Sequence, residues 1–313
     1  MVSFKEKIPQ GFDHPTANPE NAEEFQEWQE VNREWWEHHP MRYDWREQIS
    51  AAEFTPEFYR EIDRNFFSSV REYMPWKKIP FDSLINYDSL SQKDVLEIGV
   101  GSGSHAQLLA SAARSFTGID ITEYAVKSAG ERLRQLGIDA KIHRMEAERL
   151  EFPDNAFDFV WSWGVIHHSS DIRKVLQEIK RVLKPDGIAM TMVYHRNFFN
   201  YYLVGGLFHG VLLGDLLKTK SIHKTVQRIT DGAMARFYSI QEWQALAGEY
   251  LTVERISIFG NKAEIIPIPG GKFKKAVMAL IPNPLSRFVT NRCKMGTFLV
   301  SYLRKKDRPG CQQ

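Results

Sequence analysis

The stretch that decides the fold is Asp94–Asp120, DVLEIGVGSGSHAQLLASAARSFTGID. An apolar run, Val95–Ile98, leads into three closely spaced glycines, and His105–Ala113 then has the composition of a helix. A glycine directly after a strand permits a tight turn, and the later glycines let the backbone come close to a ligand. A second apolar run, Phe116–Ile119, ends in Asp120, and an acid about 20 residues past such a loop can bind both hydroxyls of a ribose. The stretch therefore predicts a site for a nucleoside cofactor.

The glycine loop alone does not identify that cofactor. Gly101, Gly103 and Ala106 fit the G-x-G-x-x-A fingerprint of dinucleotide sites. Glu97 argues against a dinucleotide, because its carboxylate suits a cationic amine and would repel a pyrophosphate. A second acidic signal follows at 146–148 (EAE) and runs on into FPDNAFD.

With these blocks together, the sequence resembles the class I S-adenosylmethionine-dependent methyltransferases, in particular the type 11-like domain of small-molecule enzymes. The matching blocks are LEIGVGSG (96–103), GID (118–120), EAERLEFPDNAFDFVWSWGVIHH (146–168) and EIKRVLKPDGIAM (178–190). The resemblance covers residues 90–193 in order. It implies an α/β fold, a doubly wound Rossmann-like sheet of seven mostly parallel strands, with S-adenosyl-L-methionine as the cofactor.

The resemblance also implies cofactor contacts, position by position. The positions are Glu97, Gly99, Gly101, Gly103, Asp120, Ile121, Glu146, Ala147 and Ser162. Asp120 would bind the ribose, Ile121 would pack against adenine, Glu146 would accept from the adenine amino group, and the backbone at Ser162 would reach the methionine amine. The family usually has Asp where this chain has Glu146; the longer side chain can make the same contact, and Glu148 can compete for it.

The alternation of strand and helix patterns divides the chain into three parts: an N-terminal arm and helical lid (1–88), a cofactor-binding core (89–195), and substrate-side helical insertions with the last two strands (196–313). Strands are expected over 95–98, 116–119, 140–143, 157–162, 188–193, 251–258 and 296–303, the last antiparallel. Helices are expected over 23–37, 55–72, 79–85, 105–113, 122–137, 171–183 and 222–230, and from 239 onward.

Aromatic and apolar segments outside the core carry the expectations about the substrate. Tyr43 and Trp45 either belong to a lid over cofactor and acceptor or only hold helices to the core. The apolar segment 197–217 can be a helix packed over the substrate pocket, a membrane-surface element or a membrane span. The basic and apolar segment 261–294 predicts an amphipathic surface helix or a membrane-surface anchor.

Histidines at two predicted strand ends are candidates for catalysis, because histidine can act as a general base near neutral pH. His195 is the first candidate for contact with the acceptor. His167 is the second, although one member of the pair His167–His168 can simply cap or pack. Tyr43 is the third, through the lid. No cysteine or acid completes a ligand set with these histidines, so no metal is expected.

Composition limits the function further. The 41 basic and 39 acidic residues are nearly balanced, so no nucleic-acid partner is expected. The two cysteines, Cys293 and Cys311, favour a reducing compartment, and the N-terminus has no signal-peptide pattern. We therefore expect a cytoplasmic protein with possible peripheral membrane contact; its oligomeric state is not readable.

These observations predict a methyltransferase that acts on a small, apolar metabolite such as an isoprenoid, a lipid-like compound or an aromatic natural product. Two alternatives stay open: a methyltransferase acting on a macromolecule (protein or RNA), and a non-catalytic cofactor-binding partner subunit.

Overall fold

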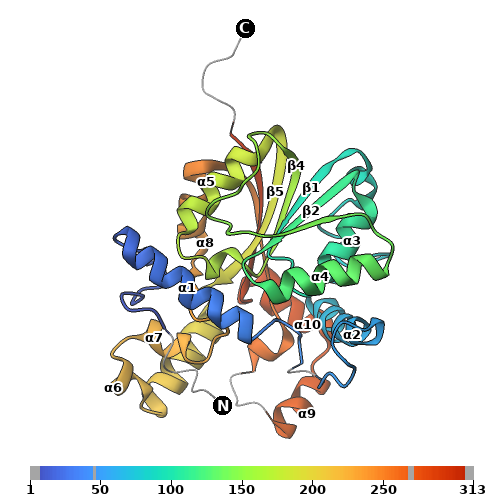
Figure 1. Cartoon of the computed structure of the whole chain (residues 1–313). Helices are drawn as coiled ribbons and strands as arrows, with labels where there is room; N and C mark the ends of the chain where they lie inside the picture. The colour runs from blue at the N-terminus through green and yellow to red at the C-terminus, as the bar shows by residue number, and fades with distance from the viewer. Residues whose placement is uncertain (1–7, 45–46, 267–270, 307–313) are drawn as a thin grey trace.

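The computed structural model describes residues 8–44, 47–266 and 271–306, and the predicted lid residue Trp45 lies outside them. A central sheet has the strand order β3-β2-β1-β4-β5-β8-β7, and β6 pairs with β5 (Figure 1). β8 is antiparallel to β5 and β7, and the other pairs are parallel. The strands are β1 Asp94–Ile98, β2 Ser115–Asp120, β3 Lys141–Arg144, β4 Phe157–Trp163, β5 Leu183–His195, β6 Phe237–Tyr238, β7 Leu251–Phe259 and β8 Phe298–Lys305. The predicted doubly wound, mostly parallel sheet is confirmed, and β6 is an additional short strand.

The helices flank the sheet and fill its lower end in Figure 1. They are α1 Ala22–His38, α2 Pro56–Tyr73, α3 Ser104–Ala112, α4 Glu123–Gln135, α5 Ile172–Val182, α6 Asp215–Thr219, α7 Ile222–Gln227, α8 Ile240–Tyr250, α9 Lys272–Leu280 and α10 Asn283–Arg287. Short 3-10 turns occur at η2 Tyr87–Gln92, η3 Ile166–His168 and η5 Lys262–Ile265, and wider π-type turns at η4 Phe198–Leu212 and η6 Phe288–Arg292.

Two helix starts show why the local predictions hold. The Thr122 hydroxyl accepts a hydrogen bond from the Ala125 amide and begins α4. Ser239 and Glu242 form a reciprocal capping box at the start of α8. Each cap satisfies amides that have no partner within the helix, so the residues at the cap set the helix boundary.

Both faces of the sheet are buried, because alternate residues of a strand point to opposite sides. Leu96 of β1 and Val160 of β4 belong to the cluster covered by α5 and α8. Val95 and Phe159 belong to the cluster covered by α2, α3 and α4. The ligand-binding region of such a two-sided sheet must therefore lie at its edge, at the carboxyl ends of the strands.

The predicted helix over 79–85 is wrong, because this segment is a turn. The Asp82 carboxylate accepts hydrogen bonds from the amides of Lys77, Lys78 and Ile79. Phe81 has a left-handed φ of 67°. A side chain that takes the preceding amides competes with helix formation, and a left-handed residue ends it.

The apolar segment η4 differs from the expected helix over the substrate pocket. Its glycine side packs on α7, and a Cβ on Gly205 would lie 2.4 Å from the Val226 side chain. Its larger side chains, such as Val211 and Leu212, are exposed. Among the described residues, no helix is both long and apolar enough to cross a membrane.

Candidate functional site

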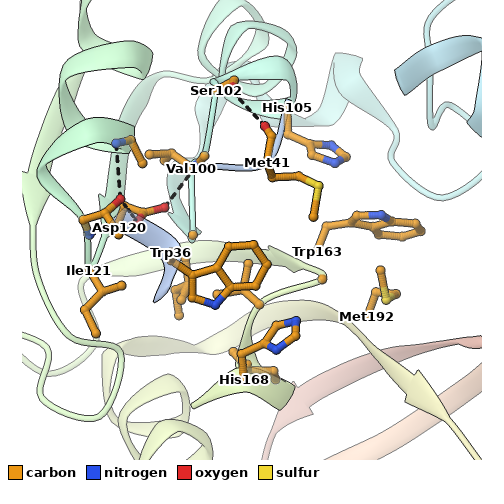
Figure 2. A pocket seen from close by; sticks show the side chains of 18 of the residues that line it. Trp36, Met41, Val100, Ser102, His105, Asp120, Ile121, Trp163, His168 and Met192 are labelled. Carbon is orange, nitrogen blue, oxygen red and sulfur yellow. Dashed lines mark hydrogen bonds between the residues drawn. The ribbon is translucent and has the colours of Figure 1, made fainter. Parts of the chain in front are cut away.

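A cavity of about 280 Å³ lies at the carboxyl ends of β1, β2 and β4 (Figure 2). Its wall is built from the glycine loop after β1, the end of β2, the loop after β4, and the C-terminal part of α1 with the chain that follows it. The volume is close to the lower end of the range for small-molecule sites, ~300 Å³. Parallel strands bring these loops together even though they are far apart in sequence.

Each glycine of the loop has a separate structural task. Gly99 has a φ of +80°, and a Cβ there would lie 2.2 Å from the Val165 side chain. Gly101 has a φ of +51° and faces open space. Gly103 has a φ of +80° and begins α3, where a Cβ would lie 3.3 Å from the Ala129 Cα on α4. Gly99 and Gly101 line the cavity, whereas Gly103 allows two helices to pack closely.

Asp120 lies in the cavity wall at the end of β2. Its Oδ2 accepts from the Gly101 amide at 3.1 Å, and its Oδ1 accepts from the amide and the hydroxyl of Thr122 at 3.1 and 2.9 Å. Burial raises the pKa of this carboxyl, although these hydrogen bonds oppose the shift. The donors fix the carboxylate while its remaining lone pairs can accept from ligand hydroxyls.

Glu97 is a buried acid with a carboxyl oxygen that has no hydrogen-bond partner in the described part of the chain. It is 1% exposed, and no hydrogen-bond partner among the described residues reaches its Oε2. Burial raises the pKa of Glu97 well above its usual range, and the negative charge of Asp120 raises it further. Because a buried, unpartnered carboxylate is costly, this pair of acids favours a ligand that brings positive charge and hydrogen-bond donors.

The wall beyond Asp120 differs in part from the sequence prediction. Ile121, Ala147 and Glu148 line the cavity. Glu146 is half-buried and lies outside the lining. Ser162 lies behind the wall, where its hydroxyl donates to the Ile98 carbonyl at 3.2 Å.

Glu148 links three segments of the wall. It accepts from Gln29 Nε2 of α1 at 2.9 Å, from the Ser169 hydroxyl at 2.6 Å and from the Ser170 amide at 2.9 Å. These bonds occupy the carboxylate with protein donors. Glu148 therefore joins α1 to the start of α5 and shapes the cavity.

Another part of the cavity wall consists of aromatic side chains. Trp36, Tyr43, Phe66 and Trp163 all contribute to the wall. Tyr43 stacks on Phe66 with ring centroids 4.5 Å apart. The chain just before Tyr43 lies on the glycine loop, since the Met41 carbonyl accepts from the Ser102 hydroxyl at 3.0 Å (Figure 2).

His168 lines this cavity, and Figure 2 shows it beside Trp36. Its Nδ1 lies 2.6 Å from the Met234 carbonyl. A carbonyl can only accept, so Nδ1 carries the proton and Nε2 of the neutral ring has a free lone pair. No partner among the described residues reaches Nε2. Burial lowers the pKa of His168, although the charge of Asp231 partly opposes this shift, so the ring is neutral at pH 7.

Neighbouring groups hold His168 in place. The Tyr194 hydroxyl donates to Asp231 at 2.8 Å, and both residues line the cavity. Gly232 packs against the imidazole so closely that a Cβ would lie 2.5 Å from Nδ1. Among the described residues, no group of three potential metal ligands lies close together.

The other two predicted histidines lie outside the cavity lining. His195 Nδ1 is 2.9 Å from the Gly296 carbonyl, so the side chain is directed at the loop before β8. His167 is fully buried between the rings of His168 and Tyr194, with centroids 4.1 and 3.9 Å away. Of the predicted catalytic residues, the structure brings only Tyr43 to the cavity.

Sequence reasoning chose His167 from the adjacent pair of histidines and missed Asp231. The adjacent histidines look equivalent in sequence, and the contact of His168 with Met234 spans 66 positions. Asp231 follows a long insertion and belongs to no recognisable pattern. In the sequence, only the position of the histidine pair after a strand indicated that this part of the chain lies near the cavity.

The core of the chain is similar to methyltransferases. Residues 96–191 match the family described as "Methyltransferase domain". The chain is 31% identical over 153 residues to the uncharacterized methyltransferase YcgJ of Bacillus subtilis, covering 49% of this chain and 54% of that protein. It is 25% identical over 184 residues to the tRNA U34 carboxymethyltransferase of Pseudoalteromonas atlantica, covering 52% and 56%.

Other similarities are shorter or purely structural. The sterol 24-C-methyltransferase ERG6B of Gibberella zeae is 35% identical over 97 residues, which cover 30% of this chain and 26% of that one. The crystal structure of the [4+2]-cyclase SpnF superimposes with a TM-score of 0.51 at 15% identity, covering 90% and 96%. The chain thus spans about half the length, or less, of these curated relatives, and the structural match shows the fold alone.

Proposed function

We propose that this chain, in which residues 96–191 form a class I S-adenosylmethionine-dependent methyltransferase domain, methylates a hydroxyl group of a small, largely apolar acceptor, with His168 as the general base. The observation that carries the proposal is that His168 lines an aromatic cavity and that its Nε2 has no hydrogen-bond partner among the described residues. Asp120 lines the same cavity, and Glu97 is buried outside its lining, next to the lining residue Ile98, so the acceptor and donor sites adjoin.

The residues at the β1 and β2 ends fit the cofactor. Glu97 would receive the ammonium group that its buried, unpartnered oxygen requires. Asp120 would accept from the ribose hydroxyls, and Ile121 with Ala147 would enclose the adenine. When bound, S-adenosylmethionine supplies an activated methyl group on a sulfonium that is its own leaving group. The protein's task is then to align the acceptor and to remove its proton.

His168 would remove that proton. The hydroxyl O–H bond of the acceptor breaks as the new O–CH₃ bond forms, and the proton moves to Nε2. The hydrogen bond from Nδ1 to the Met234 carbonyl fixes the tautomer that this step requires. The neutral ring is the form that can accept a proton, and the nearby charge of Asp231 would favour the imidazolium that forms.

The acceptor class follows from the walls. Trp36, Phe66 and Trp163 offer flat apolar surfaces, which suit a ring system or a branched hydrocarbon. One relative with a shorter similarity is named for a sterol, which supports a lipid-like acceptor. Another is named for a tRNA base, so a macromolecular acceptor is the alternative to be tested. Because a [4+2]-cyclase shares this fold, the fold alone does not establish the reaction, and methyl transfer itself must be measured.

The test combines cofactor binding with transfer of a labelled methyl group. Calorimetry should show binding of S-adenosylmethionine and S-adenosylhomocysteine. The labelled-methyl assay would use phenols, isoprenoid alcohols and sterols beside total tRNA and protein extract. Label in a small hydroxyl compound supports the proposal. Label only in tRNA or protein, or no transfer despite cofactor binding, overturns it.

The variant His168→Asn tests the basic nitrogen alone. Its amide can still donate to the Met234 carbonyl, but it has no nitrogen that can accept the proton. We expect kcat to fall by about 10²–10⁴-fold, with the affinity for S-adenosylmethionine unchanged. His195→Asn is the matched control and should keep kcat within about threefold. Wild-type activity should decline at low pH with an apparent pKa below 6.5, the ordinary value for histidine. Equal losses in the two variants would exclude His168 as the base.

A further inference from the structure

The exposed apolar side chains of this protein are concentrated in two insertions. Fifteen large hydrophobic side chains of the described residues are exposed, and thirteen of them lie within 197–230 or 271–294. The most exposed are Leu217 at 85%, Leu280 at 83% and Phe273 at 73%. Water-exposed apolar patches of this kind usually mark an interaction surface.

Both insertions lie at one end of the molecule. Figure 1 shows α6 and α7 of the first insertion and α9 of the second at the lower end, below the central sheet. The two are joined through Thr297, which accepts from the Asn200 side chain and donates to Glu264. Each insertion also meets the cavity, since Asp231 directly follows the first and Asn261 begins the second. We define the surface formed by the described residues of 197–230 and 261–294 as the insertion face.

The insertion face carries strong positive charge. It contains eleven basic and two acidic residues, a net charge of +9 with neutral histidines, against +2 for the whole chain; the rest of the chain is therefore at −7. Both acids are already engaged: Asp215 pairs with Arg228 at 3.2 Å, and Glu264 is bonded to Thr297. Lys218, Lys220, Arg292 and Lys294 are exposed and have no ion-pair partner among the described residues.

We infer that the insertion face docks onto the surface of a bilayer that contains anionic lipids. Leu217 and Phe273 would enter the interfacial region, while Lys218 and Lys220 would meet the lipid headgroups, the arrangement of a surface-bound amphipathic element. A second copy of this chain is a poor occupant, because a symmetric dimer would bring one +9 surface against another. The inference concerns binding alone and does not depend on the methyl-transfer reaction.

Vesicle co-sedimentation tests the inference directly. The full chain would be mixed with phosphatidylcholine vesicles, either pure or with about one-third phosphatidylserine. Binding to the anionic vesicles, at least tenfold above that to pure phosphatidylcholine and reduced at least threefold by about 0.5 M salt, supports it. Equal binding to both vesicles, or none, overturns it.

A pair of double variants assigns the binding to the insertion face. Leu217→Ser/Lys218→Glu should reduce binding to anionic vesicles at least tenfold. Leu136→Ser/Lys141→Glu makes the same exchange at exposed positions outside the insertion face, at and just before the start of β3, and should bind as wild type. Unchanged affinity for S-adenosylmethionine shows that both remain folded. Equal loss in the two variants, or no loss in the first, refutes the assignment, as does concentration-dependent dimerisation that the first variant abolishes.

Discussion

Replacing Glu97 by Gln should change stability and cofactor affinity in opposite directions. Glu97 is buried without a partner at Oε2 among the described residues, and it lies near the negative charge of Asp120. An unsatisfied buried polar group costs ~1–3 kcal/mol, and more when it is charged. The neutral amide has nearly the same shape, so we expect the free energy of unfolding of the ligand-free protein to rise by about 1 kcal/mol at pH 8.

The pH dependence gives a second readout with a definite sign. The pKa of Glu97 is raised above 4.5 in the folded protein by burial, then by Asp120. Above pH 4.5 the folded state therefore holds a proton that the unfolded chain has released. The contribution of this residue to stability must fall as pH rises through the raised pKa. Urea unfolding at several pH values should show a flatter slope for Glu97→Gln than for wild type.

Cofactor affinity should decline although the variant is more stable. Losing a charged hydrogen bond to the ammonium group costs ~1.5–3 kcal/mol, which is about a 10–150-fold increase in Kd. Methylthioadenosine, which lacks the amino-acid moiety, should bind both proteins equally in calorimetry. If Glu97→Gln lowered stability while leaving the Kd for S-adenosylmethionine unchanged, both the electrostatic argument and the assigned contact would be wrong.

Three further substitutions test separate parts of the structure. Gly99→Ala should lower the free energy of unfolding by at least about 2 kcal/mol, because of its positive φ and the clash with Val165. Thermal unfolding would measure this loss. Adding Val165→Ala should restore only part of the lost stability, since it removes the clash but not the strain of the positive φ. Arg236→Met should cost at least about 3 kcal/mol in urea unfolding, since this buried guanidinium donates to three backbone carbonyls that would lose their partner. Ser239→Ala removes the cap of α8 and should cost about 1 kcal/mol with cofactor affinity unchanged.

The core of the site was predictable because its signals are local. Glu97 is the last residue but one of the first strand pattern and Asp120 ends the second, and the carboxyl ends of parallel strands meet at one edge of the sheet. The left-handed conformations at Gly99 and Gly101 likewise follow from a turn that directly succeeds a strand. Such inferences need only the residues within a few positions.

The acceptor side was not predictable in the same way. Adjacent histidines on a short turn look alike in sequence, and only the hydrogen bond to Met234 distinguishes the orientation of His168. The preference for Glu148 over Glu146 in the cavity wall depends on a contact with Gln29, 119 positions away. The turn at 79–85 was not predictable either, because the hydrogen bonds that the Asp82 carboxylate accepts from preceding amides leave no periodic pattern in the sequence.

The sequence by itself determined the sheet, the order of its elements, the glycine loop and the acids near the carboxyl ends of the first two strands. These depend on strand periodicity, helix caps and glycine conformation, which act over neighbouring residues. Only the tertiary structure decided which histidine faces the cavity, which acid shapes its wall and where the apolar insertions are exposed. Those features arise from packing between segments that are tens to more than a hundred positions apart, and the energies of such contacts leave no periodic pattern in the chain.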